Sequence, residues 1–266
     1  MPNYQEIKLY KGEVKILFDE INHAYYRETE SKKERLIGVT TLIGVLDKPA
    51  LIPWAVGVTV EYIRQHLDRL QEDPRLLLSD AKAESDKLKT EAADIGTRIH
   101  AWIENHIKGI KQEMPEDERV IKGVVSFLNW EKENKVEYLE SERLVYSKHY
   151  GYAGIIDVLA RINGNLYLLD IKTGNSIYAE VKLQTAAYQQ AYEEETNKHL
   201  KGRIVLRLSK ETEEEYNERV KNKNPKYVKP YKVFESVSLV DDLKDLEAFV
   251  CCLNLYRWKQ QAEKQF

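Results

Sequence analysis

The sequence predicts an α/β protein in which helices flank a central mixed β-sheet, and three observations point to this class. Apolar residues recur at helical spacing in much of the first half, apolar strand-like runs fill the middle, and helix, strand and helix close the chain. The 266 residues are enough to bury a full core, and the contents of 42% hydrophobic and 32% charged residues are typical of a globular protein. No internal repeat or Gly/Ser-rich linker divides the chain, so we expect a single domain over residues 1–266.

The first 135 residues predict short strands followed by helices. "VKILFDEINHAYYRETE" alternates as strands do, and "RLIGVTTLIGVL" indicates a change from strand to helix. Helices are expected at 51–70, 91–110 and 115–135, with Pro115 near the start of the third. The charged residues 71–89 favour a solvated helix or a lid, so we expect a helical N-terminal elaboration.

A β-hairpin is the clearest local prediction. The arms, 154–162 and 165–172, are rich in Ile, Leu and Val, and they meet at Asn163-Gly164. Asn-Gly is the strongest short-range signal for a two-residue hairpin turn, and it fixes the register of the two arms.

This register sets Asp157 directly against Asp170. Like charges in such a position repel one another, so a positive group should lie between them. Side chains two apart on a strand share a face, which adds Lys172 to that face.

The remaining elements follow the same patterns. A strand before the hairpin, a helix, a strand and a closing helix are expected at 142–150, 178–197, 202–210 and 241–264.

Composition narrows the possible partners and the compartment. The formal net charge of -3 and the pI of about 6.1 do not indicate a nucleic-acid-binding protein, so any polyanion site must be local. Cys251 and Cys252 are adjacent and are the only cysteines, which excludes a disulfide framework and a four-cysteine zinc or iron–sulfur site within the chain. The N-terminus is too charged for a signal peptide, and "LIPWAVGVTV" is too short to span a bilayer. We therefore expect a cytoplasmic protein with no membrane partner.

The two aspartates and the lysine predict a metal centre. Mg²⁺ and Mn²⁺ are held by one or two carboxylates, waters and substrate phosphate oxygens. A desolvated Lys172 beside such an ion would have a lowered pKa and could orient or deprotonate a water molecule. A surface salt bridge at a strand edge is the alternative interpretation.

Three further candidates surround this cluster. His100 lies on one helical face with Gly96 and Glu104, where an imidazole would complete a metal shell or remain an ordinary core histidine. Glu142, which opens the strand before the hairpin, is a possible direct or water-mediated ligand or an exposed strand-end residue. Gln184 and Tyr188 are one turn apart and would bind a phosphate or Lys172, or belong to an amphipathic helix.

Taken in order, these motifs resemble the RecB-like branch of the PD-(D/E)XK nucleases, and within it phage-type nucleases and the mitochondrial genome maintenance exonuclease. A Gly-x-x-x-His helix matches "GTRIH", a Glu precedes the motif Asp that ends "GIID", "DIKT" supplies Asp-x-Lys, and "QTAAY" matches the Gln-x-x-x-Tyr box. The resemblance covers about Val39 to Tyr192. The chain lacks the four cysteines with which some relatives bind an iron–sulfur cluster, and it has no Walker-type phosphate loop.

The resemblance implies a restriction-endonuclease-like core and hydrolysis of phosphodiester bonds in DNA with Mg²⁺ or Mn²⁺ and without an iron–sulfur cluster. It divides the domain into an elaboration (1–90), a catalytic core (91–210) and a C-terminal part (211–266). The implied metal ligands are His100, Asp157, Asp170 and the Ile171 carbonyl, with Glu142 as a further one; the implied catalytic residues are Asp157, Asp170, Lys172, Gln184 and Tyr188.

An exonuclease of recombination, repair or phage DNA processing is the leading hypothesis. An endonuclease or nickase on the same fold, and a nuclease-fold protein that binds DNA or a partner without cutting, stay open. DNA is the expected partner, as a single strand or a duplex end, with a recombination or replication protein as a possible second partner.

One segment of the acidic chain is locally basic. "YNERVKNKNPKYVKPYK" interleaves lysines with tyrosines, which suits phosphate neutralisation and base stacking. The predicted DNA contacts are Arg219, Lys221, Lys223, Lys226, Tyr227 and Lys229, with Lys232, Tyr216 and Tyr231 beside them. A solvated lysine-rich loop between two strands is the alternative.

Overall fold

The computed structural model describes residues 4–240 and 243–265, apart from the side chain of Tyr227. Within this part, nine strands form one mixed sheet in the order β1-β2-β3-β4-β6-β7-β8-β9, with β5 paired to β6. The strands are β1 (Tyr4–Leu9), β2 (Val14–Asp19), β3 (Ala24–Glu28), β4 (Lys33–Gly38), β5 (Val136–Ser147), β6 (Tyr152–Ile162), β7 (Asn165–Lys172), β8 (Gly202–Leu208) and β9 (Phe234–Leu239). The β4–β6 and β7–β8 pairs are parallel and the others antiparallel.

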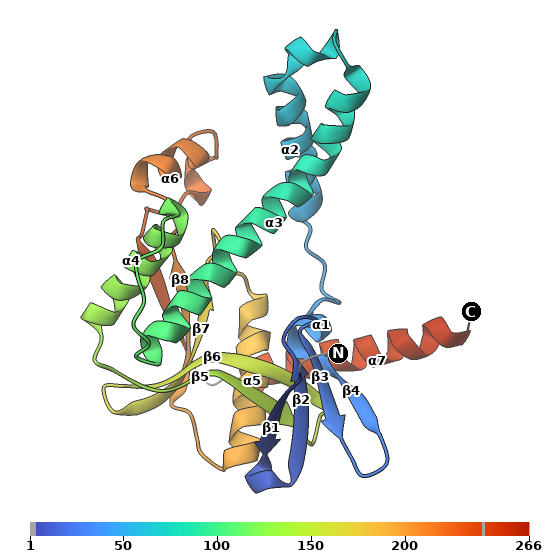
Figure 1. Cartoon of the computed structure of the whole chain (residues 1–266), viewed down its shortest axis with the longest axis vertical. Coiled ribbons are helices and arrows are strands. Elements are labelled where there is room, and N and C mark those ends of the chain that lie inside the picture. Colours follow the sequence, from blue (N-terminus) through green and yellow to red (C-terminus); the bar gives the residue numbers. More distant parts are fainter. Residues whose placement is uncertain (1–3, 241–242, 266) are drawn as a thin grey trace.

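Helices cover both faces of the sheet, which confirms the predicted α/β class (Figure 1). They are α1 (Val39–Ile43), α2 (Leu51–Gln65), α3 (Pro74–Ile107), α4 (Glu118–Glu133), α5 (Glu180–Thr196), α6 (Glu213–Val220) and α7 (Leu243–Ala262). One core joins α3 and α4 to one face of β6, β7 and β8, and a second joins α1, α5 and α7 to the other face. None of the helices in the described ranges is long and apolar enough to cross a membrane.

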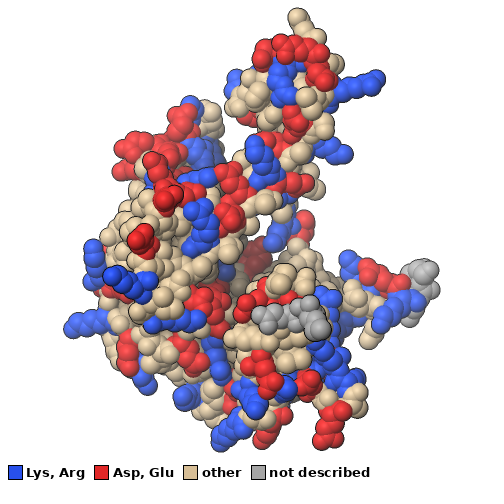
Figure 2. Space-filling model, viewed as in Figure 1, with Lys and Arg blue, Asp and Glu red and all other residues tan. Residues whose placement is uncertain are grey.

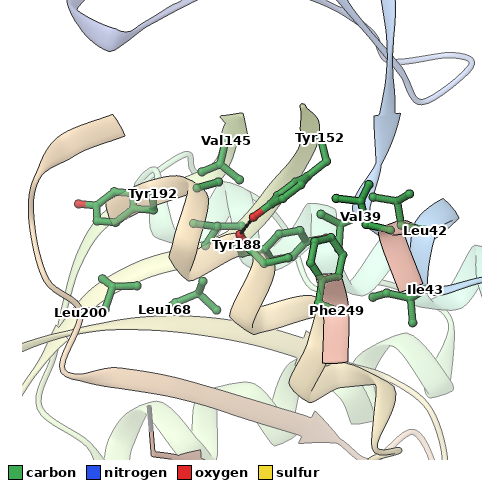
Figure 3. Close-up of a cluster of buried hydrophobic side chains, with 14 of the residues drawn as sticks. Val39, Leu42, Ile43, Val145, Tyr152, Leu168, Tyr188, Tyr192, Leu200 and Phe249 are labelled. Carbon is green, nitrogen blue, oxygen red and sulfur yellow. Dashed lines mark hydrogen bonds between the residues drawn. The ribbon is translucent and has the colours of Figure 1, made fainter. Parts of the chain in front are cut away.

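The core beneath α5 contains several aromatic side chains (Figure 3). Tyr188 of α5 is 5% exposed and packs near Tyr152, whose hydroxyl donates to the backbone oxygen of Ala187 at 2.8 Å. Phe249 of α7 meets the Tyr152 ring edge to face, with 4.9 Å between the ring centroids. This packing fixes α5 against the sheet and therefore fixes the residues that α5 presents beside β7.

The N-terminal part differs from the prediction of a helical elaboration, because its first 35 described residues are the four strands β1–β4. These strands pack their own core against β5 and β6 and extend the main sheet. The helical description holds from Val39 onward, where α1 leads into α2 and α3.

The charged segment 71–89 and the helix expected at 91–110 form one 34-residue helix, α3. The Asp73 side chain accepts the Leu76 backbone N–H at 3.0 Å, and Pro74 occupies the first position, so the helix begins at a proper N-cap. No glycine or proline interrupts it before Gly96. Figure 1 shows α2 and the first half of α3 projecting from the sheet as an arm.

The hairpin forms as predicted. Asn163 and Gly164 both have positive φ, as a two-residue type I′ turn requires, and Ile162 pairs with Asn165. The ladder ends at Val158 and Leu169, however, so Asp157 and Asp170 are not a ladder pair as expected. The register would bring them together, but the two strands separate one position too early.

This separation creates a fork in the sheet. One edge of β6 pairs with β4 at Tyr152 and Ala153, and with β7 from Val158 onward. Residues 154–157, between these two ladders, have no strand partner on that edge among the described residues. We call this gap the fork, and the candidate site lies in it.

Candidate metal centre and active site

A cavity of about 550 Å³ opens at the fork. Segments far apart in sequence line it: strand β3 and helix α1, one face of α3, strands β5 and β6, Thr173 and the start of α5. Its polar lining residues are His23, Tyr25, Thr40, Thr97, His100, Glu104, Glu142, Asp157, Thr173, Gln184 and Tyr188.

Three predicted ligands converge in this cavity. One ligand atom from each of His100, Glu142 and Asp157 lies within 4.8 Å of the others, and His100 Nδ1 is 4.0 Å from Asp157 Oδ2. His100 stands on the same face of α3 as Gly96 and Glu104, since all three line the cavity at the predicted four-residue spacing.

Glu142 does not open a strand, contrary to the prediction, because β5 begins at Val136 and places it in the middle. Its neighbours Ser141 and Arg143 pair with Val158 and Ile156, which puts Glu142 opposite Asp157. Its φ of 50° is left-handed, an uncommon and strained backbone for a glutamate within a strand.

The electrostatic setting of Glu142 is unfavourable to its charge. Solvent still reaches the residue, yet burial raises the pKa of its carboxyl to about 8, with further contributions from Asp157 and Glu104. A strained backbone that brings one carboxylate against another needs compensation, which a bound cation would supply.

Asp170 lies deeper than the other three residues. It is 1% exposed, and Lys172 Nζ is 2.7 Å from its Oδ2, but neither carboxylate oxygen has a partner of good hydrogen-bond geometry among the described residues. Burial raises the pKa of this carboxyl; Lys172 opposes the rise and Asp157 adds to it.

The pKa of Lys172 is raised, which is opposite to the expected direction. Burial by itself lowers this pKa, but the charges of Asp170 and Asp157 outweigh the effect of burial. The amine is therefore held in its charged form by the two carboxylates, so it acts as a positive charge and hydrogen-bond donor rather than as a free base.

Asp157 also holds the fork together. Its Oδ2 accepts the backbone N–H of Ile171 at 2.6 Å. Because the N–H and C=O of a strand residue point towards the same neighbour, the Ile171 carbonyl predicted as a ligand also faces the strand of Asp157.

Gln184 and Tyr188 extend the cluster as a chain of hydrogen bonds. Lys172 Nζ donates to Gln184 Oε1 at 3.2 Å, and Gln184 Nε2 donates to the Tyr188 hydroxyl at 3.0 Å. Both readings of this pair therefore apply: Tyr188 belongs to the core, and Gln184 orients the lysine.

Two glycines allow the close approach of these elements. A Cβ on Gly96 would lie 2.8 Å from Thr173 Oγ1, and one on Gly154 would lie 2.4 Å from the Tyr188 ring. Gly96 thus allows α3 to contact the chain just after Lys172.

His23, in the turn before β3, and Tyr25 of β3 line the cavity, and the sequence interpretation missed them. Burial lowers the pKa of His23. The two side chains lie 3.4 Å apart, from Tyr25 Oη to His23 Nε2. No motif marks them, because β3 reaches the fork only through the pairing of β4 with β6.

The predicted basic loop is partly helical, since α6 covers residues 213–220. The Thr212 side chain accepts the Glu215 N–H while Glu215 accepts the Thr212 N–H, and this capping box begins the helix. The Tyr216 hydroxyl donates to the Lys229 carbonyl, and the Tyr231 hydroxyl donates to the Glu211 backbone carbonyl at 2.8 Å, so both tyrosines brace the segment.

Acidic neighbours partner several of the basic side chains. Arg219 pairs with Glu211 at 2.5 Å, Lys221 with Glu218, and Lys229 with Glu235 at 3.6 Å. Lys223, Lys229 and Arg219 line a hollow of about 230 Å³, whereas Lys221 and Lys226 do not. The side chain of Tyr227 lies outside the described residues. In Figure 2 basic and acidic residues are interspersed over the face in view.

The donor set of the fork fits a hard divalent cation. Carboxylates and an imidazole are ligands that Mg²⁺ and Mn²⁺ accept, and the buried Asp170 oxygens have no partner of good hydrogen-bond geometry among the described residues, although Lys172 Nζ lies 2.7 Å from Oδ2. His100, Glu142 and Asp157 would hold the ion, with Asp170 and the Ile171 carbonyl next to them.

Comparisons with known proteins leave the family open. No protein-family model matches the chain, and no curated protein matches it. A solved structure described as "Crystal structure of SSO0001" is similar over 83% of this chain and 75% of that chain, at 15% identity and a TM-score of 0.33. A similarity this low supports no conclusion about fold or activity.

Proposed function

We propose that the protein is a metal-dependent DNA nuclease with a restriction-endonuclease-like core, of the RecB-like type that its motifs resemble. The observation that carries this proposal is the convergence of His100, Glu142 and Asp157 in one cavity. Asp170 and Lys172 come from the adjacent strand of the same fork. The hairpin and α3 are far apart in sequence. A salt bridge with a purely structural role needs only the charged residues of the hairpin and would not require His100 of α3 beside them.

A divalent cation bound there would polarise a phosphodiester and make a water molecule more acidic. Lys172, held charged by the two aspartates, would donate to a phosphate oxygen or position the attacking water. Gln184 fixes the lysine through the bond to its amine, and Tyr188 fixes Gln184 in turn. The residues of the chain would therefore orient the phosphodiester and the water, and they would neutralise the negative charge that develops on the phosphate as the bond is cleaved.

Within this class we favour an exonuclease that acts on DNA ends in recombination, repair or phage DNA processing, in the cytoplasm. DNA substrates of different topology separate this proposal from the endonuclease alternative. Linear, circular and single-stranded DNA are each incubated with Mg²⁺ or Mn²⁺ and, as a control, with EDTA. An exonuclease degrades the linear DNA and leaves the circular DNA intact, whereas an endonuclease cuts both.

Lys172→Ala tests the assignment of the site, with Lys135→Ala at the remote end of the hairpin as the matched lysine control. Lys172→Ala should lower the cleavage rate at least a hundredfold, and Lys135→Ala should leave it unchanged. Absence of cleavage by the wild type, or equal cleavage by Lys172→Ala, would overturn the proposal.

A further inference from the structure

A second, smaller hollow adjoins the cavity at the fork. Its volume is about 200 Å³, and it shares Ala92 and Thr173 with the first cavity. Thr173 directly follows Lys172, so the wall between the two hollows begins one residue after the candidate catalytic lysine. The charged residues that line the second hollow are Glu91, Arg119, Arg207, Lys210 and Glu211.

Most of these charges already have partners. Arg119 pairs with Glu91 at 2.6 Å, and Glu211 pairs with Arg219 of α6. Arg207 donates to the Lys232 carbonyl at 3.1 Å and lies 3.5 Å from Glu235. Each carboxylate of this hollow is therefore engaged with an arginine.

Lys210 is different. Within the described ranges no hydrogen bond or ion pair to its amine is found, although the residue is largely surrounded by protein. Burial lowers the pKa of Lys210, Arg119 lowers it further, and Glu211 partly opposes both. An ammonium group in this position costs free energy, which an anion entering the hollow would recover.

A third hollow continues from the second. It is the 230 Å³ hollow already described, and it shares Asn175, Arg207, Ser209 and Glu211 with the second. Its other basic lining residues are Arg219, Lys223, Lys229 and Lys232. The three hollows thus follow one another from the fork, with its carboxylates, to the lysine-rich residues 216–232.

We propose that the hollow around Lys210 binds a backbone phosphate of a single-stranded DNA substrate. This phosphate neighbours the phosphodiester that occupies the fork, on the side that leads towards residues 216–232. The inference rests on the proposed function and adds to it the path of the bound strand. Lys210 makes the direct contact, Arg119 and Arg207 add positive potential, and the strand continues past Asn175 into the third hollow. This path explains how a protein of negative net charge binds a polyanion, because the basic side chains that contact the phosphates are gathered in the second and third hollows.

Binding measured apart from cleavage tests the inference. Fluorescein-labelled (dT)12 is titrated with the protein in Ca²⁺, and the affinity is followed by anisotropy over a range of salt concentrations. One lost phosphate contact on a single strand reduces the slope of log K against log salt by about 0.7. We therefore expect Lys210→Gln to reduce the slope by about 0.7 and the affinity roughly tenfold at low salt.

Two variants serve as controls. Lys210→Arg keeps the charge and should retain the wild-type slope, and Lys135→Gln removes an exposed lysine at the far end of the hairpin. Lys210→Gln should fold normally, because it removes a charge that is unpaired among the described residues; thermal melting checks this. A wild-type slope for Lys210→Gln overturns the inference.

The same oligonucleotide, incubated with Mn²⁺, separates the two proposals. Binding that depends on Lys210 without any cleavage supports the phosphate site and overturns the nuclease. Cleavage with binding independent of Lys210 overturns the phosphate site alone. A protein that neither binds nor cuts the oligonucleotide contradicts both.

Discussion

Asp157 Oδ2 accepts the backbone N–H of Ile171 at 2.6 Å, at the point where β6 and β7 stop pairing as strands. A side chain has replaced the ladder bond that would otherwise continue the hairpin. The same carboxylate lies within 4.8 Å of ligand atoms of His100 and Glu142. One residue thus both bridges the fork, where the ladder has ended, and faces the cavity within it.

The structural part of this role is testable by comparing two substitutions that both remove the charge. Asp157→Ala leaves the Ile171 N–H without its acceptor and should reduce the free energy of unfolding by about 1–3 kcal/mol relative to Asp157→Asn. Asn keeps an acceptor oxygen at the same distance along the side chain. Urea unfolding in EDTA measures the difference, and equal stabilities of the two variants would contradict the bond.

Glu142 predicts a pH dependence of stability. Its pKa in the folded protein, about 8, lies above the ordinary value of 4.5, so its contribution to stability is fully present below pH 4.5 and is lost as the pH rises through 8. Glu142→Gln should therefore become more stable than the wild type as the pH rises from 5 to 9, by on the order of 1 kcal/mol, because solvent screens part of the repulsion.

Urea unfolding in EDTA at pH 5, 7 and 9 measures this trend. Glu137→Gln, an exposed residue of the same strand, is the matched control and should show no such trend. A constant difference between Glu142→Gln and the wild type over this pH range would show that the protein does not disfavour the Glu142 charge.

The close approach of α3 to Thr173 predicts a coupling between two positions. Gly96→Ala places a Cβ 2.8 Å from Thr173 Oγ1 and should destabilise the protein by about 1–3 kcal/mol. Thr173→Ala removes the opposing oxygen, so the double variant should lose less than the sum of the single losses. Additive losses in a thermal or urea double-mutant cycle would place the cost of Gly96→Ala elsewhere, for example in the cavity lining.

Metal binding should stabilise the fold. A divalent ion that binds the native state only, at a hundred times its dissociation constant, adds about 2.7 kcal/mol. We expect Mn²⁺ to raise the melting temperature of the wild type and to have a much smaller effect on His100→Ala. His106→Ala is the control, since His106 lies on the same helix but pairs with Glu131 at 3.0 Å outside the cavity. Equal shifts for both histidine variants would remove His100 from the metal centre.

Local signals made part of this fold predictable. Asn163-Gly164 fixed the register of the hairpin, and the four-residue spacing of Gly96, His100 and Glu104 placed all three on the cavity face of α3. The periodicity of the apolar residues likewise located α4, α5 and α7 to within a few residues.

Long-range packing determined what the sequence did not show. β6 separates from β7 at Asp157, and the start of the same β6 edge pairs with β4, a strand far away in the sequence, so no local pattern indicates where the hairpin ladder ends. Glu142 likewise has a left-handed backbone in the middle of β5, which the strand-like pattern of its neighbours does not indicate. The direction in which the Lys172 pKa moves depends on two carboxylates whose effect exceeds that of burial, and this balance depends on how the folded chain places the three groups.

The most direct test of the central claim is the position of a metal ion in a crystal soaked in Mn²⁺ with a short oligonucleotide. We predict an anomalous peak in the fork, within ligand distance of Asp157 and at least one of His100, Glu142 and Asp170, with a phosphate oxygen beside it. A fork without manganese, or manganese bound only at surface carboxylates, would contradict the account.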